Sequence, residues 1–274
     1  MVHKVTGKNV IVTGGASGLG AGFVERLLEL GAKNVAVIDI AEQTGKALVE
    51  RLNQTTAGKA IFVKCDVSKE DEIKAAFDEV LATFKQIDIL VNNAGIMDDS
   101  PEFWRKSCDL NWQGIVSFTM KAVNHMTKAD GGAGGTIINM SSAAALGRGP
   151  LVPVYSGSKM AILHFSQNIA MDPFFAQTGI RILIMCCGLT DTAILEGLEK
   201  RAYNPELGKL LAKYLPAAPS GYQKISSAVD AFIQMYETGS PGSIWYSSKN
   251  QPGRDITKIV NTAFDEFDRS ILKA

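Results

Sequence analysis

The sequence is poor in histidine and cysteine, and neither residue occurs in a pattern that would bind a metal. The three histidines among 274 residues have no metal-ligand spacing, and no His-Glu-x-x-His motif is present. None of the four cysteines forms a Cys-x-x-Cys pair: Cys65, Cys108, Cys186 and Cys187. We therefore expect reduced thiols, a reducing compartment and no metal site. The Gly-x-Ser-x-Gly elbow of hydrolases is also missing.

No charge of either sign is in excess, and no apolar run is long. Lysine plus arginine and aspartate plus glutamate number 28 each, and the isoelectric point is near 6.8. This balance gives no electrostatic reason to expect a nucleic acid or an anionic membrane as partner. The N-terminal segment has no signal-peptide core, and no unbroken apolar stretch is long enough for a bilayer. We expect a soluble, cytoplasmic protein whose 46% hydrophobic residues supply a sizeable core.

Short apolar runs alternate with amphipathic stretches along the chain. The runs predict strands at 9–13, 35–40, 61–65, 87–92, 136–140, 181–186 and 243–246. Helical patterns lie between them, for example at 19–30, 42–53, 70–84, 112–126 and 155–175. Several runs are apolar at consecutive positions, as in parallel strands covered on both faces. The alternation has no linker, so it predicts an α/β fold with one domain, 1–274, and a doubly wound parallel sheet.

The stretch 190–220 departs from this alternation. It is helical in pattern, follows a predicted strand and ends in LPAAPS. Loops after strand ends are where open α/β sheets bind ligands, so the stretch is a candidate for covering a substrate. An ordinary surface excursion is the alternative.

A glycine-rich turn, TGGASGLG, joins the first strand to the first helix. Gly14, Gly18 and Gly20 let the backbone turn sharply and approach a diphosphate, and the helix N-terminus adds free N–H donors. Ser17 and Leu19 belong to the same turn. Because the string lies after a strand and before a helix, it predicts a dinucleotide site, with a plain tight turn as the alternative.

Asp39 ends the second predicted strand about 20 residues after these glycines, where a carboxylate accepts hydrogen bonds from the adenosine ribose. The carboxylate would repel a 2′-phosphate, and neither Ile40 nor Ala41 is a cation that could bind one. NAD is therefore favoured over NADP. A strand-end aspartate that caps the next turn is the alternative.

Two further groups follow the third and fourth strands. Asp66 is a candidate to contact the adenine edge, with Val67 packing on the ring, and helix capping competes with this interpretation. Asn93, Ala94 and Gly95 are small enough to let a cofactor pass close to the backbone. A simple asparagine-glycine turn is the alternative there.

Tyr155 and Lys159 form the sequence YSGSK near the start of an apolar helix. Residues four apart share one helix face, so the ammonium and the phenol can share a site. A free tyrosine has a pKa of about 10, too high for a general base near neutrality. A nearby lysine charge and the positive nicotinamide of an oxidised cofactor would stabilise the phenolate.

Two polar residues are candidates to complete this site. Ser142 ends a predicted strand 13 residues before Tyr155 and is a candidate to bind the substrate oxygen, and Ser141 is a candidate to line the cofactor. Serines at strand ends are otherwise turn formers. Asn111 could hold a water that relays protons to Lys159, although a buried asparagine more often satisfies neighbouring backbone.

The motifs TGGASGLG, CDV, DILVNNAG, INMSS and YSGSK, together with Asp39 and Asn111, stand in the order of the short-chain dehydrogenase/reductase family, which the chain resembles over nearly its whole length. The glycine spacing resembles the ordinary, non-extended branch. The resemblance implies a Rossmann-type, seven-stranded sheet, a homodimer or homotetramer, and a tetrad of Asn111, Ser142, Tyr155 and Lys159. Tyrosine would be the acid/base and lysine would hold the ribose and lower the tyrosine pKa.

The resemblance also implies cofactor contacts after the sixth strand, at Gly188 and at Thr190 or Thr192. Cys187 stands where many family members have proline, which puts the rigidity of that turn in doubt. Within the family the chain looks most like 15-hydroxyprostaglandin dehydrogenase-like and insect alcohol dehydrogenase-like members. The expected activity is NAD-dependent oxidation of a secondary, apolar alcohol to a ketone. A carbonyl reductase and a non-catalytic NAD-binding protein are the alternatives.

The expected substrate wall is apolar, although leucines at helical spacing are about as often core. Its candidates surround the motifs in sequence: Leu146, Leu151, Val152, Leu189, Ile194, Leu195 and Leu198.

Overall fold

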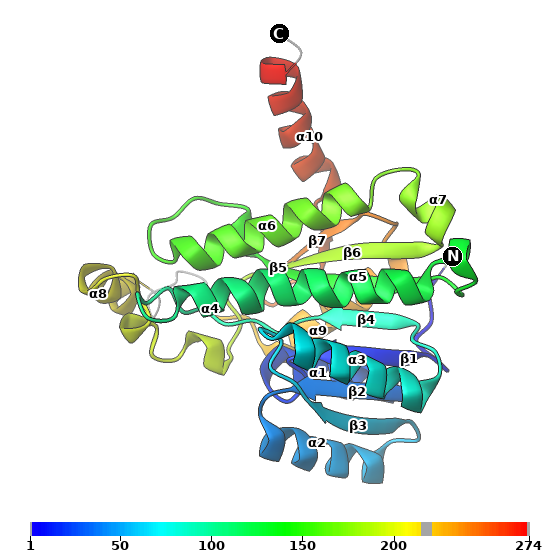
Figure 1. Cartoon of the computed structure of the whole chain (residues 1–274). Helices are drawn as coiled ribbons and strands as arrows, with labels where there is room; N and C mark the ends of the chain where they lie inside the picture. The colour runs from blue at the N-terminus through cyan, green and yellow to red at the C-terminus, as the bar shows by residue number, and fades with distance from the viewer. Residues whose placement is uncertain (1, 215–220, 273–274) are drawn as a thin grey trace.

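A computed structural model describes residues 2–214 and 221–272. Within these residues the chain forms one sheet in the order β3-β2-β1-β4-β5-β6-β7-β8 (Figure 1). The first seven strands are parallel: β1 (Asn9–Thr13), β2 (Asn34–Asp39), β3 (Lys59–Lys64), β4 (Ile89–Asn92), β5 (Gly135–Ser142), β6 (Ile180–Cys187) and β7 (Ile244–Ser247). This is the doubly wound, Rossmann-type sheet that the sequence predicts.

The number of strands differs from the prediction. In the described part of the chain the sheet has eight strands, because the two-residue strand β8 (Arg254–Asp255) pairs antiparallel with β7. Two residues are too few to produce a periodic pattern, so the sequence gives no signal for it. The consecutive apolar runs are explained by burial on both faces: all eight residues of β6 and all five of β1 are buried.

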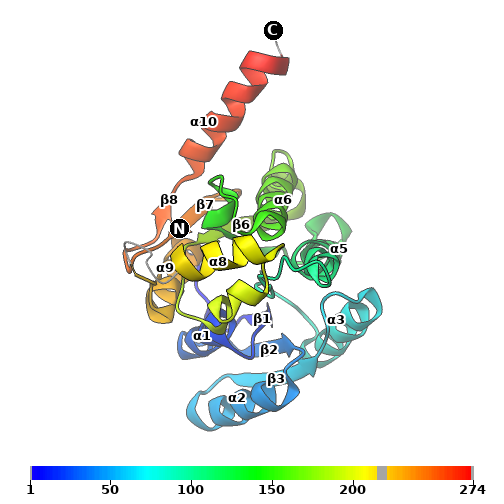
Figure 2. The same ribbon diagram turned by 90° about the vertical axis from the view of Figure 1, so that its left-hand side faces the viewer.

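Helices cover both faces of the sheet (Figures 1 and 2). Side chains of α1 (Gly18–Glu29), α2 (Glu42–Thr55) and α9 (Ile225–Thr238) share one hydrophobic cluster, in which Phe23 stacks on Phe232. Those of α3 (Glu70–Phe84) and α5 (Gly114–Met126) share a second cluster, with Phe77 and Phe118 in contact. The amphipathic patterns therefore mark the faces that pack on the sheet.

Helix boundaries differ from the sequence-based ranges at two places. The helix expected at 112–126 begins earlier, with α4 (Trp104–Cys108), and continues through a π-helical turn, Asp109–Gln113, into α5. The helix expected at 155–175 is α6 (Pro153–Ile169), followed by the separate short α7 (Phe174–Thr178). Asp172 precedes Pro173, and the residue before a proline disfavours helical backbone.

The stretch after β6 leaves the sheet and returns to it. It contains two short 3-10 turns, Ala193–Leu195 and Leu198–Lys200, and the helix α8 (Pro205–Tyr214). Of the predicted covering segment 190–220, residues 215–220 lie outside the described residues. The last helix, α10 (Thr257–Phe267), projects from the body of the molecule (Figure 1). Among the described helices, none combines the length and apolar character needed to cross a membrane.

Candidate active site

A cavity of about 930 Å³ opens where the parallel strands end. Every residue that the sequence assigns to the cofactor lines it, as do Ser142, Tyr155 and Lys159. The cofactor set comprises Gly14, Ser17, Gly18, Leu19, Gly20, Asp39, Ile40, Asp66, Val67, Asn93, Ala94, Gly95, Gly188, Thr190 and Thr192. Asn111 is fully buried and lies behind the lining. Residues scattered over the sequence thus meet at the carboxyl edge of one sheet, where open α/β sheets bind ligands.

The glycine-rich turn is compact enough to require glycine. Gly14 and Gly18 have φ values of 62° and 53°, in the left-handed region. A side chain on Gly20 would overlap the carbonyl oxygen of Gly14. Helix α1 begins at Gly18 without a side-chain cap from Ser17, so its first N–H groups are available to an anion. The turn therefore fits a diphosphate.

Asn93 fastens this turn to the end of β4. Its side-chain amide donates hydrogen bonds to the carbonyl oxygens of Thr13 and Gly14, at 3.0 and 3.1 Å. The Thr13 hydroxyl in turn accepts from the backbone N–H groups of Asn93 and Ala94. The asparagine is thus a structural clamp at the floor of the cavity, a role that the local sequence does not indicate.

Asp39 is engaged by the backbone on both oxygens. Its carboxylate accepts hydrogen bonds from the N–H groups of Ala16 and Ala41, each at 3.0 Å. The turn-capping role that the sequence left open is therefore present. The carboxylate also lines the cavity, and since each oxygen has two lone pairs, it can still accept from a ribose hydroxyl.

Asp66 is also held by protein groups. One oxygen accepts from the N–H and the hydroxyl of Ser68, and the other forms a 3.1 Å ion pair with Lys106. Burial raises the pKa of Asp66, but the Ser68 hydrogen bonds and Lys106 outweigh it and lower the pKa overall. Asp66 therefore stabilises the turn before α3, but it is not the helix cap that the sequence left open, because the N-cap residue of α3 is Lys69 and has no side-chain cap. Lys106, which the sequence analysis did not single out, brings a cation to the same wall of the cavity.

Helix α6 carries Tyr155 and Lys159, both buried, one turn apart. The Lys159 ammonium lies 5.7 Å from the centre of the Tyr155 ring and donates a 3.0 Å hydrogen bond to the carbonyl oxygen of Met140. Burial lowers the pKa of Lys159 to about 8. Burial raises the pKa of Tyr155 to about 12, and the neighbouring Ser142 hydroxyl acts in the opposite direction. In the protein alone, desolvation outweighs the expected lowering of the tyrosine pKa by lysine.

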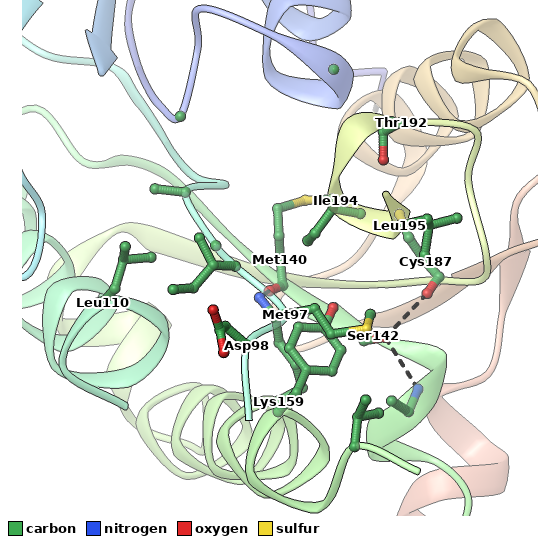
Figure 3. A pocket seen from close by; sticks show the side chains of 18 of the residues that line it. Met97, Asp98, Leu110, Met140, Ser142, Lys159, Cys187, Thr192, Ile194 and Leu195 are labelled. Atoms are coloured by element: carbon green, nitrogen blue, oxygen red, sulfur yellow. Dashed lines mark hydrogen bonds between the residues drawn. The ribbon is translucent and has the colours of Figure 1, made fainter. Parts of the chain in front are cut away.

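The two serines at the end of β5 have different partners. Ser142 accepts a hydrogen bond from the N–H of Ala144 at 3.1 Å and donates to the carbonyl oxygen of Cys187 at 3.5 Å (Figure 3). Ser141 donates to the carbonyl oxygen of Lys159 at 2.8 Å. Ser141 therefore ties the strand to α6, while Ser142 lies beside the phenol.

Asn111 lies in the π-helical turn before α5, a feature that is frequent at functional sites. Its side-chain oxygen accepts from the N–H of Ile96, and its amide donates to the Ile96 carbonyl, both at 2.9 Å. A β-carbon on Gly95 would lie 3.3 Å from both the Asn111 oxygen and the Lys159 nitrogen. The backbone-satisfying alternative is observed, and a water relay to Lys159 stays a prediction.

The turn after β6 is held firmly although Cys187 replaces proline. The Gly188 N–H donates to the carbonyl oxygen of Ser247 at 2.7 Å. Thr190 pairs with Gln223 in an isolated bridge, and the buried Gln223 amide donates to the Thr190 hydroxyl at 2.9 Å. Thr192 faces the glycine turn, within about 3.5 Å of a β-carbon on Gly18. Both candidate threonines line the cavity, and Thr190 has the more fixed side chain.

The substrate end of the cavity is mostly apolar. Of the expected wall, Leu151, Val152, Leu189, Ile194 and Leu195 line it, whereas Leu146 and Leu198 do not. Leu198 is instead buried against Tyr155 and Met97. Several residues of the wall were not predicted. Four come from loops and helices with no motif, and Met140 lies in the INMSS motif but was not assigned to the wall: Met97, Phe103, Leu110, Leu211 and Met140. Figure 3 shows the labelled members of both groups around the cavity, with Asp98 among them.

Comparison with known proteins agrees with this architecture. The model of the short chain dehydrogenase family matches residues 8–202. The NAD(+) 15-hydroxyprostaglandin dehydrogenase of Mus musculus is 39% identical over 197 residues, which cover 72% of each chain. Alcohol dehydrogenase 1 of Ceratitis cosyra is 32% identical over 268 residues, covering 96% of this chain and 98% of its own.

A solved structure is similar in fold. A short chain dehydrogenase/reductase of Burkholderia phymatum in complex with NAD superposes with a TM-score of 0.74 at 22% identity, covering 85% of this chain and 86% of its own.

Proposed function

The chain belongs to the short chain dehydrogenase family, and on that premise we propose that it is an NAD-dependent dehydrogenase that oxidises a secondary, apolar alcohol to a ketone. The observation that carries the proposal is the convergence of Ser142, Tyr155 and Lys159 on one cavity with the glycine turn. The relative from Mus musculus, whose name specifies NAD(+), supports the choice of cofactor.

The cofactor assignment fits the shape and charge of the cavity. The glycine turn has no room for a side chain at Gly20, so its backbone can approach a diphosphate. Asp39 would accept from the ribose and repel a 2′-phosphate. When bound, NAD supplies the nicotinamide carbon that accepts the hydride and a positive ring that favours the tyrosine phenolate.

The chain's own residues divide the remaining work. Ser142 holds the substrate oxygen, and Tyr155 takes the hydroxyl proton as the carbon-bound hydrogen leaves. The Lys159 ammonium, one turn from the phenol, stabilises the phenolate and holds the cofactor ribose. Met97, Leu151 and the other apolar wall residues exclude water and suit a medium or long apolar alcohol.

One observation favours a second candidate, a carbonyl reductase that uses the same site in reverse. Burial keeps Tyr155 protonated, with a pKa of about 12, and a protonated phenol is the form that donates a proton to a ketone oxygen. Comparing NAD reduction with NADH and NADPH oxidation over matched alcohols and ketones distinguishes the two directions.

The test is a screen for NADH formation with prostaglandin-like, terpenoid, steroid and short aliphatic alcohols. Tyr155→Phe should abolish turnover while leaving NAD binding intact. Tyr203→Phe is the matched control, because Tyr203 is exposed and does not line the cavity. Turnover that persists in Tyr155→Phe, or the absence of turnover by the wild type on every substrate, would refute the proposal.

A further inference from the structure

Asp99 is a buried carboxylate that the catalytic scheme does not use. It lies in the segment between β4 and α4 and has no solvent exposure. Within residues 2–214 and 221–272, no salt bridge to Asp99 is found. A buried carboxylate without a cation is costly unless hydrogen bonds satisfy it. The partners of Asp99 therefore indicate what it does.

Those partners are the first N–H groups of the helix that carries Tyr155. One Asp99 oxygen accepts from the N–H of Val154 at 2.7 Å, and the other accepts from the N–H of Tyr155 itself at 3.0 Å. Pro153 has no N–H, and Val152, at the N-cap position of α6, has no capping side chain. A residue more than fifty positions earlier thus performs the cap that the local sequence cannot supply.

The charge suits this position. The N-terminus of a 17-residue helix carries the positive end of its dipole, which stabilises an anion. Burial raises the pKa of Asp99, and the hydrogen bonds from Val154 and Tyr155 oppose that rise. Asp98 beside it raises the pKa further, so the helix end is the source of compensation that Asp99 has for its charge.

The backbone of Asp99 makes a third connection. Its N–H donates to the carbonyl oxygen of Arg201 at 2.8 Å, and the Arg201 guanidinium donates to the carbonyl oxygen of Ile194 at 3.3 Å. Arg201 and Ile194 belong to the stretch after β6 and line the cavity. Asp99 therefore touches the loop after β4, the start of α6 and the wall that faces the substrate.

We propose that Asp99 is a positioning residue: its carboxylate fixes the backbone of Tyr155, and so the place of the phenol relative to Ser142 and Lys159. This inference rests on the proposed role of Tyr155 as acid/base. Removing the carboxylate leaves the buried N–H of Tyr155 and the partly buried N–H of Val154 without acceptors and lets the first turn of α6 shift. A misplacement of about 1 Å costs on the order of 100-fold in rate.

The experiment compares Asp99→Ala and Asp99→Asn with Asp255→Ala in the full-length protein. Asp255 is the matched control, because its carboxylate accepts from the N–H of Thr257 at 2.9 Å at the start of α10, away from the cavity. We measure kcat and KM for the alcohol, the dissociation constant of NADH and the melting temperature. Rates are normalised to the number of NADH sites.

Asp99→Ala should lower kcat by about 10- to 100-fold, with the NADH dissociation constant changed by less than about 2-fold. Asp99→Asn keeps one acceptor oxygen and should lose only about 3- to 10-fold. Asp255→Ala should lower the melting temperature with kcat unchanged.

Wild-type kcat in Asp99→Ala would overturn the inference, as would an equal kcat loss in Asp255→Ala. If Asp99→Ala does not fold, Asp99→Asn decides: a kcat below about one third of wild type with NADH binding retained supports positioning, and an unchanged kcat overturns it. Failure of the proposed function is seen separately, as turnover that survives Tyr155→Phe.

Discussion

The ammonium of Lys159 lies 5.7 Å from the centre of the Tyr155 ring, and its hydrogen bond goes to the carbonyl oxygen of Met140. Both side chains are buried, and burial moves their pKa values apart, to about 8 for lysine and about 12 for tyrosine. Burial thus acts against the charged form of each side chain, and most strongly against the phenolate at neutral pH. Added positive charge in the cavity would shift the tyrosine toward the phenolate.

Replacing Lys159 with methionine removes the cation that the scheme places beside Tyr155. We expect kcat for alcohol oxidation to fall by at least about 100-fold, equivalent to roughly 3 kcal/mol of transition-state stabilisation. Steady-state kinetics with NADH fluorescence measure it. Lys121→Met is the control, since Lys121 of α5 pairs with Glu70 of α3, outside the cavity. A Lys159→Met enzyme within a factor of three of wild type would contradict the assigned role.

We expect the lowered pKa of Lys159 to make the stability of the protein depend on pH. Lys159 has a folded pKa of about 8 against 10.5 for the unfolded chain. Between these values the unfolded state binds the extra proton, so this residue makes the free energy of unfolding rise with pH, by up to roughly 3 kcal/mol. Below pH 8 both states are protonated and the penalty is fully present.

Denaturant unfolding of wild type and Lys159→Met at several pH values between 7 and about 10.5 measures this. Subtracting the two curves cancels groups that do not interact with Lys159, such as the buried Cys65 thiol, whose raised pKa acts in the opposite direction. The free energy of unfolding of the wild type should increase relative to that of Lys159→Met as the pH rises. A difference that is flat with pH would show that the lysine stays charged in the folded protein.

Asp39 should determine the choice of cofactor. In Asp39→Ala, the N–H groups of Ala16 and Ala41 lose their acceptor and the 2′-phosphate is no longer repelled. We expect NADH to bind about 10- to 100-fold more weakly, roughly 1.4–2.7 kcal/mol, and the preference over NADPH to shrink. Fluorescence titration measures both. Asp88→Ala is the matched control for Asp39→Ala, because the Asp88 carboxylate also accepts a hydrogen bond from a backbone N–H, that of Asn9, but lies outside the cavity. Unchanged discrimination in Asp39→Ala would remove the argument for NAD.

Gly20→Ala should damage both stability and cofactor binding. Its methyl group would overlap the carbonyl oxygen of Gly14, and forced overpacking typically costs about 1–3 kcal/mol. Gly157→Ala is the opposite case: a β-carbon there meets nothing within 4 Å, and alanine should stabilise α6 by about 0.5–1 kcal/mol. Thermal and denaturant unfolding of the two variants should move in opposite directions. Movement in the same direction would contradict the packing argument.

Most of the sheet could be predicted because its strands are apolar at consecutive positions, which few other structures require. The short β8 could not, since two residues such as Arg254 and Asp255 carry no periodicity. The start of the helix before Asn111 was missed because α4 and the π-helical turn contain polar residues that obscure the pattern. The homodimer or homotetramer and the cytoplasmic location stay predictions.

The residues of the candidate site also fall into those that local motifs predict and those that they do not. Residues in local motifs, such as Gly14 and Tyr155, could be predicted and do line one cavity. Asp99 and Lys106 could not, because each acts on a residue about forty or more positions away, on Tyr155 and on Asp66. Such pairs exist only after folding. Local sequence contains no trace of them.

The bridge between Thr190 and Gln223 has a practical consequence for redesign. The stretch after β6 leaves the scaffold at Thr190, and the chain rejoins it at Gln223. The buried Gln223 side-chain amide donates to both the Thr190 hydroxyl and the carbonyl oxygen of Ser247. Since closing a loop costs only slightly more as it lengthens, this excursion can be exchanged or extended while its anchor is kept. Grafting alternative excursions onto these two residues, with Thr192 and Arg201 retained, is therefore a direct route to new substrate ranges.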